Sequence, residues 1–479
     1  MREYCRIIQG GMGVGVSNWK LAQTVSRAGQ LGVVSGTALD QILSRRLQDG
    51  DEGGHMRRGM DAFPFPAMAK RVLDTYFVPG GKPERTPYRT VPLLARENPR
   101  ELAELCIVSN FVEVFLAREG HNNPVGINYL EKIQAALLPC VYGAMLGGVE
   151  YVLMGAGIPL KFPGVLDLFA NHQPAEYNMH VHGSIEGDDT MMRFNPAEFA
   201  ERKLAPLTRP KFLAIVSSNT LATTMVKKAN GRVDGLIIEM RTAGGHNAPP
   251  RGKLQLTESG EPIYGERDDI DIAKLCDLGV PFWLAGGYGH PEKLREALAQ
   301  GATGVQVGTA FEFASESGLR EDYKRDLLAK VIAGTSHVFT DPLASPTGFP
   351  FKVAQLEGTY SEAELYAARP RICNLGFLRE PYRTSEGEIG YRCPAEPLTL
   401  YVSKGGNAED IVGRKCICNA LLANVGFPQV LNGQRVELGI VTAGDDLSTV
   451  AQFLPPGESH YSALDVIAEL EKGCSPIVA

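Results

Sequence analysis

The fold is decided by residues 282–309, which read FWLAGGYGHPEKLREALAQGATGVQVGT. Two short apolar runs, Phe282–Gly287 and Gly304–Thr309, flank a helical stretch at Pro291–Ala299, and both runs end in glycine-containing turns. Apolar runs of this length are typical of parallel strands that are buried on both faces, and the helix between them supplies the crossover that such strands need. This stretch therefore predicts a parallel βαβ unit.

The same pattern recurs along the first two thirds of the chain. Six further apolar runs precede the unit, at Arg6–Gly10, Leu31–Gly36, Val125–Leu130, Tyr151–Gly155, Phe212–Ser217 and Gly235–Met240. Helical stretches lie between them, among them Asn18–Ala28, Pro99–Arg118, Ser218–Ala229 and Asp269–Leu278. Eight βα units in succession favour an α/β fold of the TIM (β/α)8 barrel type over a doubly wound sheet, which has about five or six strands.

Two long insertions and a C-terminal extension complete the predicted organisation. Residues 37–123 and 171–210 follow strands, so we expect them to form lids at the carboxyl end of the barrel. The barrel domain is predicted over residues 1–334. Residues 335–479 form a mixed extension with helices at Asp410–Asn424 and Ser462–Lys472, and its large apolar residues predict that it packs on the barrel.

Composition restricts the class of protein. The 479 residues are 44% hydrophobic and 22% charged, with a net charge of −7, which is typical of a globular protein that binds small molecules and not nucleic acid. An odd number of cysteines, nine, spread over a long chain is not a disulfide framework. We expect no signal peptide and no membrane span, and hence a cytoplasmic protein.

Glycines gather at the predicted strand ends. They occur in five turns, as Gln9–Gly13, Gly155–Gly157, Ala243–His246, Ala285–Gly287 and Gln306–Thr309. Glycine lets backbone N–H groups approach a ligand closely, and the turns after the last two strands are where many barrels hold a phosphate. The pattern therefore predicts a phosphorylated cofactor at this rim.

Several blocks of the chain resemble one flavoenzyme family. The blocks QGGMGVGVSNWKLAQTVSRAGQLGVVSG, GINYL, GAGIP, AGGHNAPPRG, VPFWLAGGYG and GATGVQVGTAFEFASESG, within about residues 5–345, are similar to the FMN-dependent nitronate monooxygenase (2-nitropropane dioxygenase) family and to its relative, the flavin-type enoyl-acyl-carrier-protein reductase. The resemblance implies FMN at the barrel mouth. The residues that it places on the phosphate are Gly286, Gly287, Gly308 and Thr309, and those along the flavin are Gly11, Met12, Asn128 and Gln306. We also expect Gly155, Gly244 and Gly245, in the glycine turns after two further strands, to bind the cofactor.

His246 is the predicted catalytic residue. It follows two glycines and precedes the rigid turn Asn247–Pro250, which departs from the family pattern, so we expect its imidazole at the mouth of the barrel. Histidine can take or give one proton near neutral pH. Such a group suits proton removal from a nitroalkane and proton delivery to an enoyl thioester equally well. Asn128, a polar residue within the apolar run VGINYL, must find a polar partner near the strand end.

Two weaker groups of residues leave alternatives open. His180 and His182 would share one face of a predicted strand, with His172 nearby, and they either line a lid or subunit contact or bind a metal. Four cysteines concentrate in the extension, as Cys373, Cys393, Cys416 and Cys418. They are reduced buried side chains, ligands of a structural metal, or a redox centre.

Three functions remain at this stage. The leading one is a nitronate monooxygenase, which oxidises alkyl nitronates with O2 to a carbonyl compound and nitrite. The second is an NAD(P)H-dependent enoyl-thioester reductase that acts with a fatty acid or polyketide synthase, with an acyl carrier protein as partner. The third is a flavin-binding subunit or sensor without turnover. A homodimer is compatible with each of them.

Overall fold

The computed structural model describes residues 4–431, 433 and 435–474. Its centre is an eight-stranded parallel sheet in which the strands follow the order β1-β10-β9-β8-β7-β4-β3-β2. The strands are β1 (Ile7–Gln9), β2 (Gly32–Ser35), β3 (Val125–Leu130), β4 (Tyr151–Gly155), β7 (Lys211–Val216), β8 (Gly235–Glu239), β9 (Phe282–Ala285) and β10 (Gly304–Val307). All eight predicted strands are therefore confirmed.

The sheet closes into a barrel through a parallel bridge between Ile8 and Leu31. The N–H of Leu31 donates to the carbonyl of Ile7 at 3.1 Å, and the N–H of Gln9 donates to the carbonyl of Leu31 at 3.0 Å. Alternate side chains fill the interior with one apolar cluster that includes Leu153 and Trp283. The predicted α/β TIM-barrel fold is confirmed.

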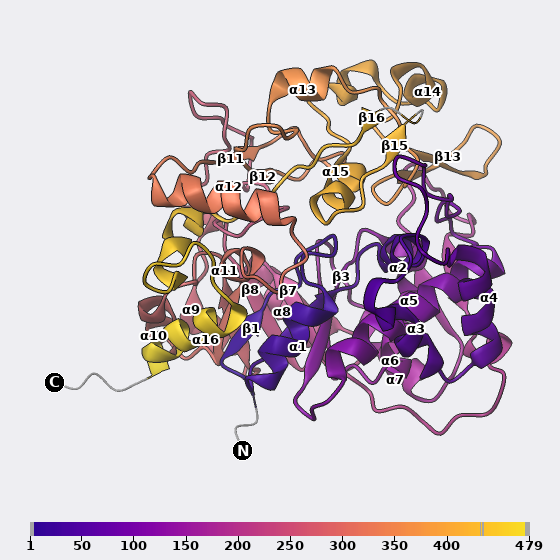
Figure 1. The fold of residues 1–479 in the computed structure, drawn as a ribbon, viewed down its shortest axis with the longest axis horizontal. Helices are drawn as coiled ribbons and strands as arrows, with labels where there is room; N and C mark the ends of the chain where they lie inside the picture. The colour runs from indigo at the N-terminus through magenta and orange to yellow at the C-terminus, as the bar shows by residue number, and fades with distance from the viewer. Residues whose placement is uncertain (1–3, 432, 434, 475–479) are drawn as a thin grey trace.

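Helices surround the barrel (Figure 1). Those that follow the predicted βα pattern are α1 (Trp19–Arg27), α6 (Leu137–Leu146), α7 (Phe162–Ala170), α8 (Asn219–Lys228), α9 (Ile272–Cys276), α10 (Pro291–Ala299), α11 (Thr309–Glu312) and α12 (Glu321–Ile332). Their buried residues recur on one face. In α1, for example, Leu21, Ala22 and Val25 are buried, while Asn18 caps the helix by accepting from the N–H of Leu21.

The first insertion forms a helical layer beside the barrel. It comprises α2 (Leu39–Gln48), α3 (His55–Asp61), α4 (Pro66–Tyr76) and the long α5 (Arg100–Arg118), and the first three pack on α5 (Figure 1). The second insertion contains the antiparallel hairpin β5 (Ala175–Asn178) and β6 (Met191–Phe194), which lies against α6 and α7.

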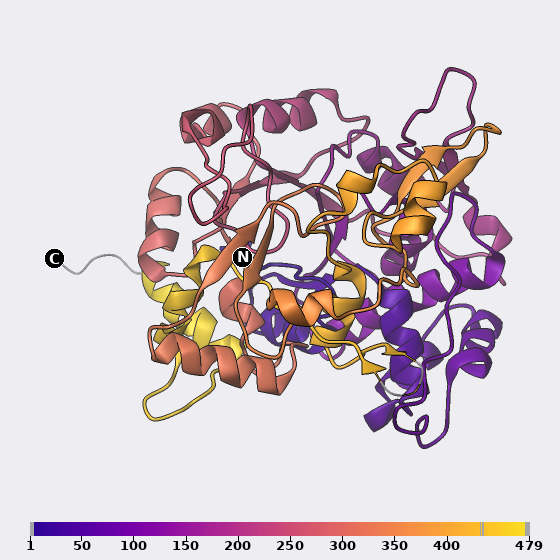
Figure 2. The same ribbon diagram turned by 90° about the horizontal axis from the view of Figure 1, so that it is seen from above.

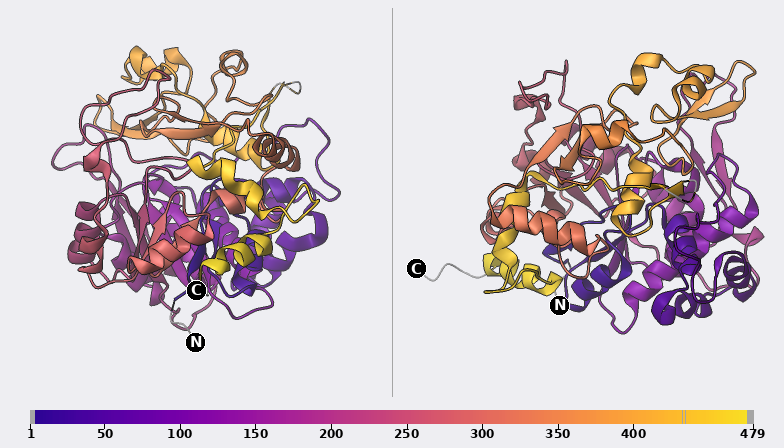
Figure 3. Two further views of the ribbon diagram at one scale, coloured as in Figure 1. Left: turned by 90° about the vertical axis from the view of Figure 1, so that its left-hand side faces the viewer. Right: turned by 45° about the horizontal axis from the view of Figure 1, so that its top comes forward.

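The C-terminal extension lies across one end of the barrel and then returns to its side. Its first part holds β11 (Val338–Asp341), β12 (Phe351–Ala354), α13 (Ala363–Ala367), β13 (Glu380–Arg383), β14 (Ile389–Arg392), α14 (Leu398–Ser403), α15 (Ile417–Asn424), β15 (Val430–Leu431) and β16 (Arg435–Val436). Figure 2 shows these orange elements over the barrel, and both views of Figure 3 place them on one side of it.

The end of the extension packs between barrel helices. A 3-10 stretch, Asp445–Phe453, contacts α11 and α12, and α16 (Ala463–Glu471) contacts α1 and α10. The hydroxyl of the buried Tyr461 donates to the carbonyl of Ala310 at 2.7 Å. These contacts join the extension to the barrel wall as well as to its rim.

The helix predicted at Asp410–Asn424 is shorter than expected. A 3-10 turn covers Ala408–Ile411, and α15 begins only at Ile417. Gly413 lies between them with φ of +71°, a left-handed conformation that ends a right-handed helix. Within the described residues, no helix is long and apolar enough to span a membrane.

Candidate functional site

A cavity of about 470 Å³ opens at the carboxyl ends of the barrel strands, where barrel enzymes carry their chemistry. The twelve residues singled out from the sequence all line it: Gly11, Met12, Asn128, Gly155, Gly244, Gly245, His246, Gly286, Gly287, Gln306, Gly308 and Thr309. The fold thus brings together residues that are widely separated in the chain. Their roles toward a ligand remain predictions.

The extension covers this cavity. It contributes Phe349, Phe351, Phe377, Leu378, Ile417, Cys418, Leu421, Thr442 and Asp446 to the lining. Of the two segments expected to form lids, residues 37–123 and 171–210, the described structure brings one member, Thr37, to the lining. The cover is therefore mostly apolar and comes from residues that follow the barrel in the chain.

Two glycines show why the rim needs this residue type. Gly286 has φ of +91°, and a Cβ there would lie 2.9 Å from the backbone nitrogen of Ala243. A Cβ on Gly11 would lie 2.3 Å from the Cβ of Asn128. A side chain at either position would displace the neighbouring chain, so both turns keep their backbone groups open to the cavity.

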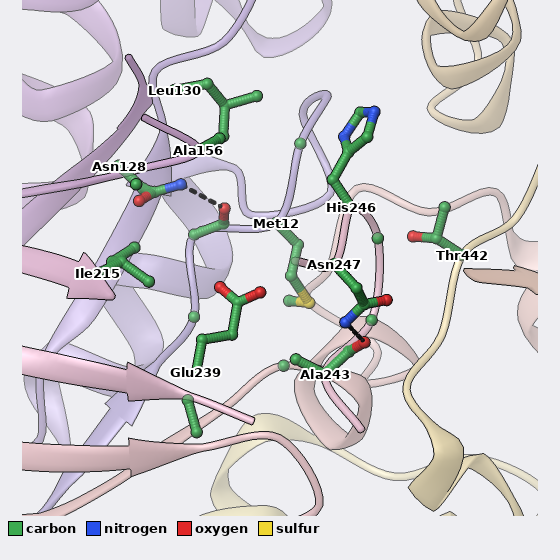
Figure 4. A pocket seen from close by; sticks show the side chains of 18 of the residues that line it. Met12, Asn128, Leu130, Ala156, Ile215, Glu239, Ala243, His246, Asn247 and Thr442 are labelled. Carbon is green, nitrogen blue, oxygen red and sulfur yellow. Dashed lines mark hydrogen bonds between the residues drawn. The ribbon is translucent and has the colours of Figure 1, made fainter. Parts of the chain in front are cut away.

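Three carboxamide side chains in the lining are only partly satisfied. The Nδ2 of Asn128 donates to the carbonyl of Gly11 at 3.1 Å, and the Nδ2 of Asn247 donates to the carbonyl of Ala243 at 2.8 Å (Figure 4). The oxygens of both amides, and the Oε1 of Gln306, are buried without a partner among the described residues. Buried amide oxygens normally accept a hydrogen bond. A flavin mononucleotide carries one ring N–H and several ribityl hydroxyls, which could donate to these oxygens, so the residues fit that group.

The turn expected to bind phosphate is shared with the extension. The Oγ1 of Thr309 accepts from the N–H of Gly444 at 2.9 Å, and the carboxylate of Asp446 accepts from the hydroxyl of Thr309 and the N–H of Gly289. The hydroxyl that the sequence assigns to phosphate therefore already has protein partners. The main-chain groups of Gly286, Gly287 and Gly308 remain the predicted phosphate donors.

Glu239 lines the cavity and was not singled out from the sequence. Burial raises the pKa of its carboxyl group to about 7, and the positive charge of Lys132 opposes that rise. Figure 4 shows the Glu239 side chain among the residues that line the pocket. A charged residue within the apolar run GLIIEM was the available signal, of the same kind that identified Asn128.

Lys132 is the positively charged residue that acts electrostatically on Glu239. Its Nζ is buried without a hydrogen-bond partner in the described part of the chain, and it lies 4.5 Å from the ring centroid of Phe349. Burial lowers the pKa of Lys132 to about 8, and the charge of Glu239 opposes this shift. The charge of Lys132 therefore favours the ionised form of Glu239, and the charge of Glu239 favours the ionised form of Lys132.

His246 lies at the contact between barrel and extension. Its Nε2 is 2.7 Å from the Oγ of Ser345, and its ring centroid is 4.8 Å from that of Phe351. Burial, with a smaller contribution from the charge of Lys132, holds the pKa of His246 well below its ordinary value. The imidazole is therefore neutral at pH 7, which is the form that accepts a proton.

The three other histidines singled out from the sequence, His172, His180 and His182, do not form a group that could hold a metal. The Nδ1 of His172 is 2.9 Å from the hydroxyl of Tyr142, and its Nε2 is 2.9 Å from the carbonyl of Ala205. His180 and His182 lie beyond the end of β5, so the prediction that they belong to that strand is wrong, although both are exposed on either side of the buried Val181. His182 forms a β-bridge with Tyr382. Among the described residues, no group of histidines, cysteines and carboxylates is arranged to hold a metal ion.

Comparison with known proteins supports the resemblance seen in the sequence. A probable nitronate monooxygenase of Staphylococcus saprophyticus is 26% identical over 125 residues, or 26% of this chain and 34% of the relative. The nitronate monooxygenase of Paraburkholderia phytofirmans is 25% identical over 234 residues, or 48% of this chain and 57% of the relative.

A third relative has a different printed activity. The (3aS,4S,5R,7aS)-5-hydroxy-7a-methyl-1-oxo-octahydro-1H-indene-4-carboxyl-CoA dehydrogenase of Mycobacterium tuberculosis is 30% identical over 109 residues, or 23% of this chain and 27% of the relative. The similar regions therefore span 27% to 57% of the length of these three curated relatives.

Solved structures with a similar arrangement include FabK from Thermotoga maritima, at a TM-score of 0.49 and 17% identity, covering 98% of this chain and 92% of that chain. Another is nitroalkane oxidase from Streptomyces ansochromogenes, at a TM-score of 0.44 and 16% identity, covering 98% of this chain and 96% of that chain.

The family model described as nitronate monooxygenase matches residues 190–342, a segment that contains His246 and the turns after β8, β9 and β10. The resemblance is thereby confirmed: over residues 190–342 this chain carries the sequence pattern of the nitronate monooxygenase family.

Proposed function

We propose that this protein is an FMN-dependent oxidoreductase that oxidises alkyl nitronates with O2 to a carbonyl compound and nitrite. The observation that carries the proposal is the group of three buried amide oxygens that lack donors, in the same cavity as a half-buried, neutral histidine. The family match over residues 190–342 supports a flavin as the group that completes these amides.

Each part of the cavity has a role in this proposal. When bound, FMN supplies the two-electron chemistry of the oxidation and the reaction with O2. The amides of Asn128 and Gln306 orient the cofactor through their free oxygens, and the glycine turns at Gly287 and Gly308 hold its single phosphate. The phenyl rings supplied by the extension exclude water from the substrate.

His246 manages the proton on the carbon next to the nitro group. An imidazole whose Nε2–H donates to the Oγ of Ser345 leaves Nδ1 unprotonated, and in that tautomer Nδ1 is the atom that takes or returns this proton. A nitroalkane must lose the proton to become a nitronate, whereas a preformed nitronate needs none removed. His246 therefore matters more for the neutral nitroalkane than for its anion.

The alternative is an NAD(P)H-dependent enoyl-thioester reductase. The similarity to curated carboxyl-CoA dehydrogenases of Mycobacterium tuberculosis and Rhodococcus jostii, at 30% and 27% identity, favours a thioester substrate. In that reaction His246 would deliver a proton to Cα after hydride transfer.

Anaerobic mixing of the protein with an alkyl nitronate or with NADPH distinguishes the nitronate oxidation from the enoyl-thioester reduction. The flavin absorbance of the purified full-length protein should bleach with an alkyl nitronate and recover on admission of O2, with nitrite as a product. Bleaching by NADPH alone, followed by recovery with an enoyl thioester, would establish the reductase. A flavin that neither compound reduces would contradict both reactions and indicate a binding subunit or sensor.

A pair of histidine variants tests the assigned proton acceptor. His246→Ala should bleach slowly with a neutral nitroalkane and much faster with the preformed nitronate. His180→Ala is the matched control, because this histidine is exposed and lies outside the cavity. Equal loss with both substrates would show that His246 positions the substrate without taking its proton.

A further inference from the structure

The wall that the extension gives to the cavity differs in chemistry from the wall that the barrel gives. The barrel contributes the glycine turns and the unpartnered amide oxygens of Asn128, Asn247 and Gln306. Seven of the nine described extension residues in the lining are phenylalanine, leucine, isoleucine or cysteine. The charged one, Asp446, accepts from the hydroxyl of Thr309 at the turn predicted to bind phosphate. The cavity therefore has a polar side and an apolar side.

The apolar side is the surface of a small core within the extension. In α15, Ile417 and Leu421 are four positions apart, so they share one face of the helix, with Cys418 beside them. Ile417 packs in one cluster with Phe351 of β12 and with Leu378, which precedes β13. Leu421 and Cys418 pack against the edge of this cluster. Packed side chains, and not a loose loop, thus bound the cavity on this side.

This apolar wall begins next to the predicted proton acceptor. A β-bridge joins His246 to Phe351, and the N–H of Asn247 donates to the carbonyl of Pro350 at 2.9 Å. The ring centroids of His246 and Phe351 are 4.8 Å apart. A substrate whose reacting carbon lies at His246 therefore meets apolar side chains with the part of the molecule that faces the extension.

The entrance of the cavity is apolar as well. Ile158, in the turn after β4, lines the cavity and is 52% exposed, and the exposed Pro249 lines it from the segment after β8. Ile417, by contrast, is 1% exposed, so it belongs to the buried part of the lining. A hydrocarbon group would therefore have apolar contacts both at the entrance and inside.

We propose that the extension forms a subsite for a large hydrocarbon group of the substrate, and that Leu421 helps to set this preference. An apolar wall contributes to binding only where hydrocarbon covers it and removes it from water, which the smallest nitroalkanes cannot do. The wall lies beyond residues 190–342, the segment that matches the family model, so the family pattern does not specify it. The inference rests on the proposed function in one respect, since it leaves the polar side of the cavity to the cofactor.

A homologous series of alkyl nitronates tests the subsite on the holoenzyme. From nitroethane to nitrohexane, kcat/KM should rise by up to about fourfold for each added methylene, which corresponds to about 0.8 kcal/mol for each buried CH2. Leu421→Asn should flatten this rise. Leu400→Asn is the matched control and should keep it, because Leu400 is exposed on α14 and lies outside the cavity. No rise in the wild type, or an equal rise in Leu421→Asn, would overturn the proposal.

Unreactive alkanols separate a failure of the subsite from a failure of the proposed function. Ethanol, butanol, hexanol and octanol are titrated into the full-length protein, with the flavin absorbance as the signal or, for flavin-free protein, the shift in Tm. Affinity should rise with chain length, and less steeply in Leu421→Asn than in Leu400→Asn.

The two sets of results have distinct meanings. A rise in alkanol affinity without any nitronate oxidation would reject the proposed function and support the subsite. Nitronate oxidation without a dependence on chain length in either experiment would support the proposed function and overturn the subsite. If Leu421→Asn is insoluble, the chain-length dependence of the wild-type protein decides.

Discussion

Replacing Glu312 by glutamine should stabilise the protein at neutral pH. Glu312 lines the cavity, is 4% exposed and lies near Asp446, and burial with the charge of Asp446 raises the pKa of its carboxyl group from 4.5 to about 8. The folded state therefore binds a proton that the unfolded chain releases above pH 4.5. This contribution is fully present below pH 4.5 and is lost as the pH rises toward 8.

The size of the expected change in the free energy of unfolding follows from the pH range between the two pKa values of Glu312. At about 1.4 kcal/mol for each pH unit between 4.5 and 7, keeping Glu312 protonated costs about 3 kcal/mol of folding free energy at pH 7. Glutamine has nearly the same shape and no titratable proton. Glu312→Gln should therefore raise the free energy of unfolding by up to about 3 kcal/mol at pH 7, and by much less near pH 5.

Denaturant unfolding of flavin-free protein between pH 5 and 8 measures this difference. Glu364→Gln is the control, because Glu364 is exposed on α13. The wild-type stability should fall with rising pH relative to Glu312→Gln, and the two curves should converge toward pH 5. A pH-independent difference between them would refute the reasoning, since it would assign the effect to packing and not to the proton.

Three further predictions concern the cofactor, the histidine and the extension. The protein should be yellow and release FMN on denaturation; FAD on chromatography would contradict the single phosphate position at Gly287 and Gly308. His246→Ala should lower turnover of a neutral nitroalkane at least about 10²-fold while the flavin stays bound, and an unchanged kcat over the whole pH range would refute the assignment. Truncation after Gly334 should give insoluble or flavin-poor protein, because it removes the cover of the cavity and the buried Tyr461. A soluble fragment with full FMN content and an unchanged Tm would show that the extension is a separate module.

The barrel was predictable because its signals are local. Each strand is a short apolar run that ends in glycine, and the parallel arrangement follows from the helix between successive runs. The residues of the cavity were predictable for the same reason, since the carboxyl ends of parallel strands meet at one rim. Asn128 shows this well, because a polar residue in a buried strand has few places to find a partner.

The other features of the site could not be predicted, because they depend on contacts between segments that are distant in the sequence. Nothing near Glu239 or Lys132 in the sequence shows that the two charges act on each other. Nor does it show that Lys132 lies against the ring of Phe349, more than two hundred positions further along the chain. The apolar residues of the extension predicted that it packs on the barrel and helps enclose the site or join subunits, and the insertions were expected to be lids, but no local pattern shows that the extension supplies most of the cover. The engagement of Thr309 by Gly444 and Asp446 is a third such contact, and it reduces the set of donors left for phosphate.

The cavity is lined by residues from both ends of the chain, including Gly11 and Asp446. On a translating ribosome the barrel strands emerge first, and the last residues of the cover follow more than a hundred positions after β10. A nascent barrel would therefore present an open, apolar mouth until synthesis is almost finished. Only completed chains would then retain the cofactor stably, and products of premature termination would be recognisable by their lack of colour.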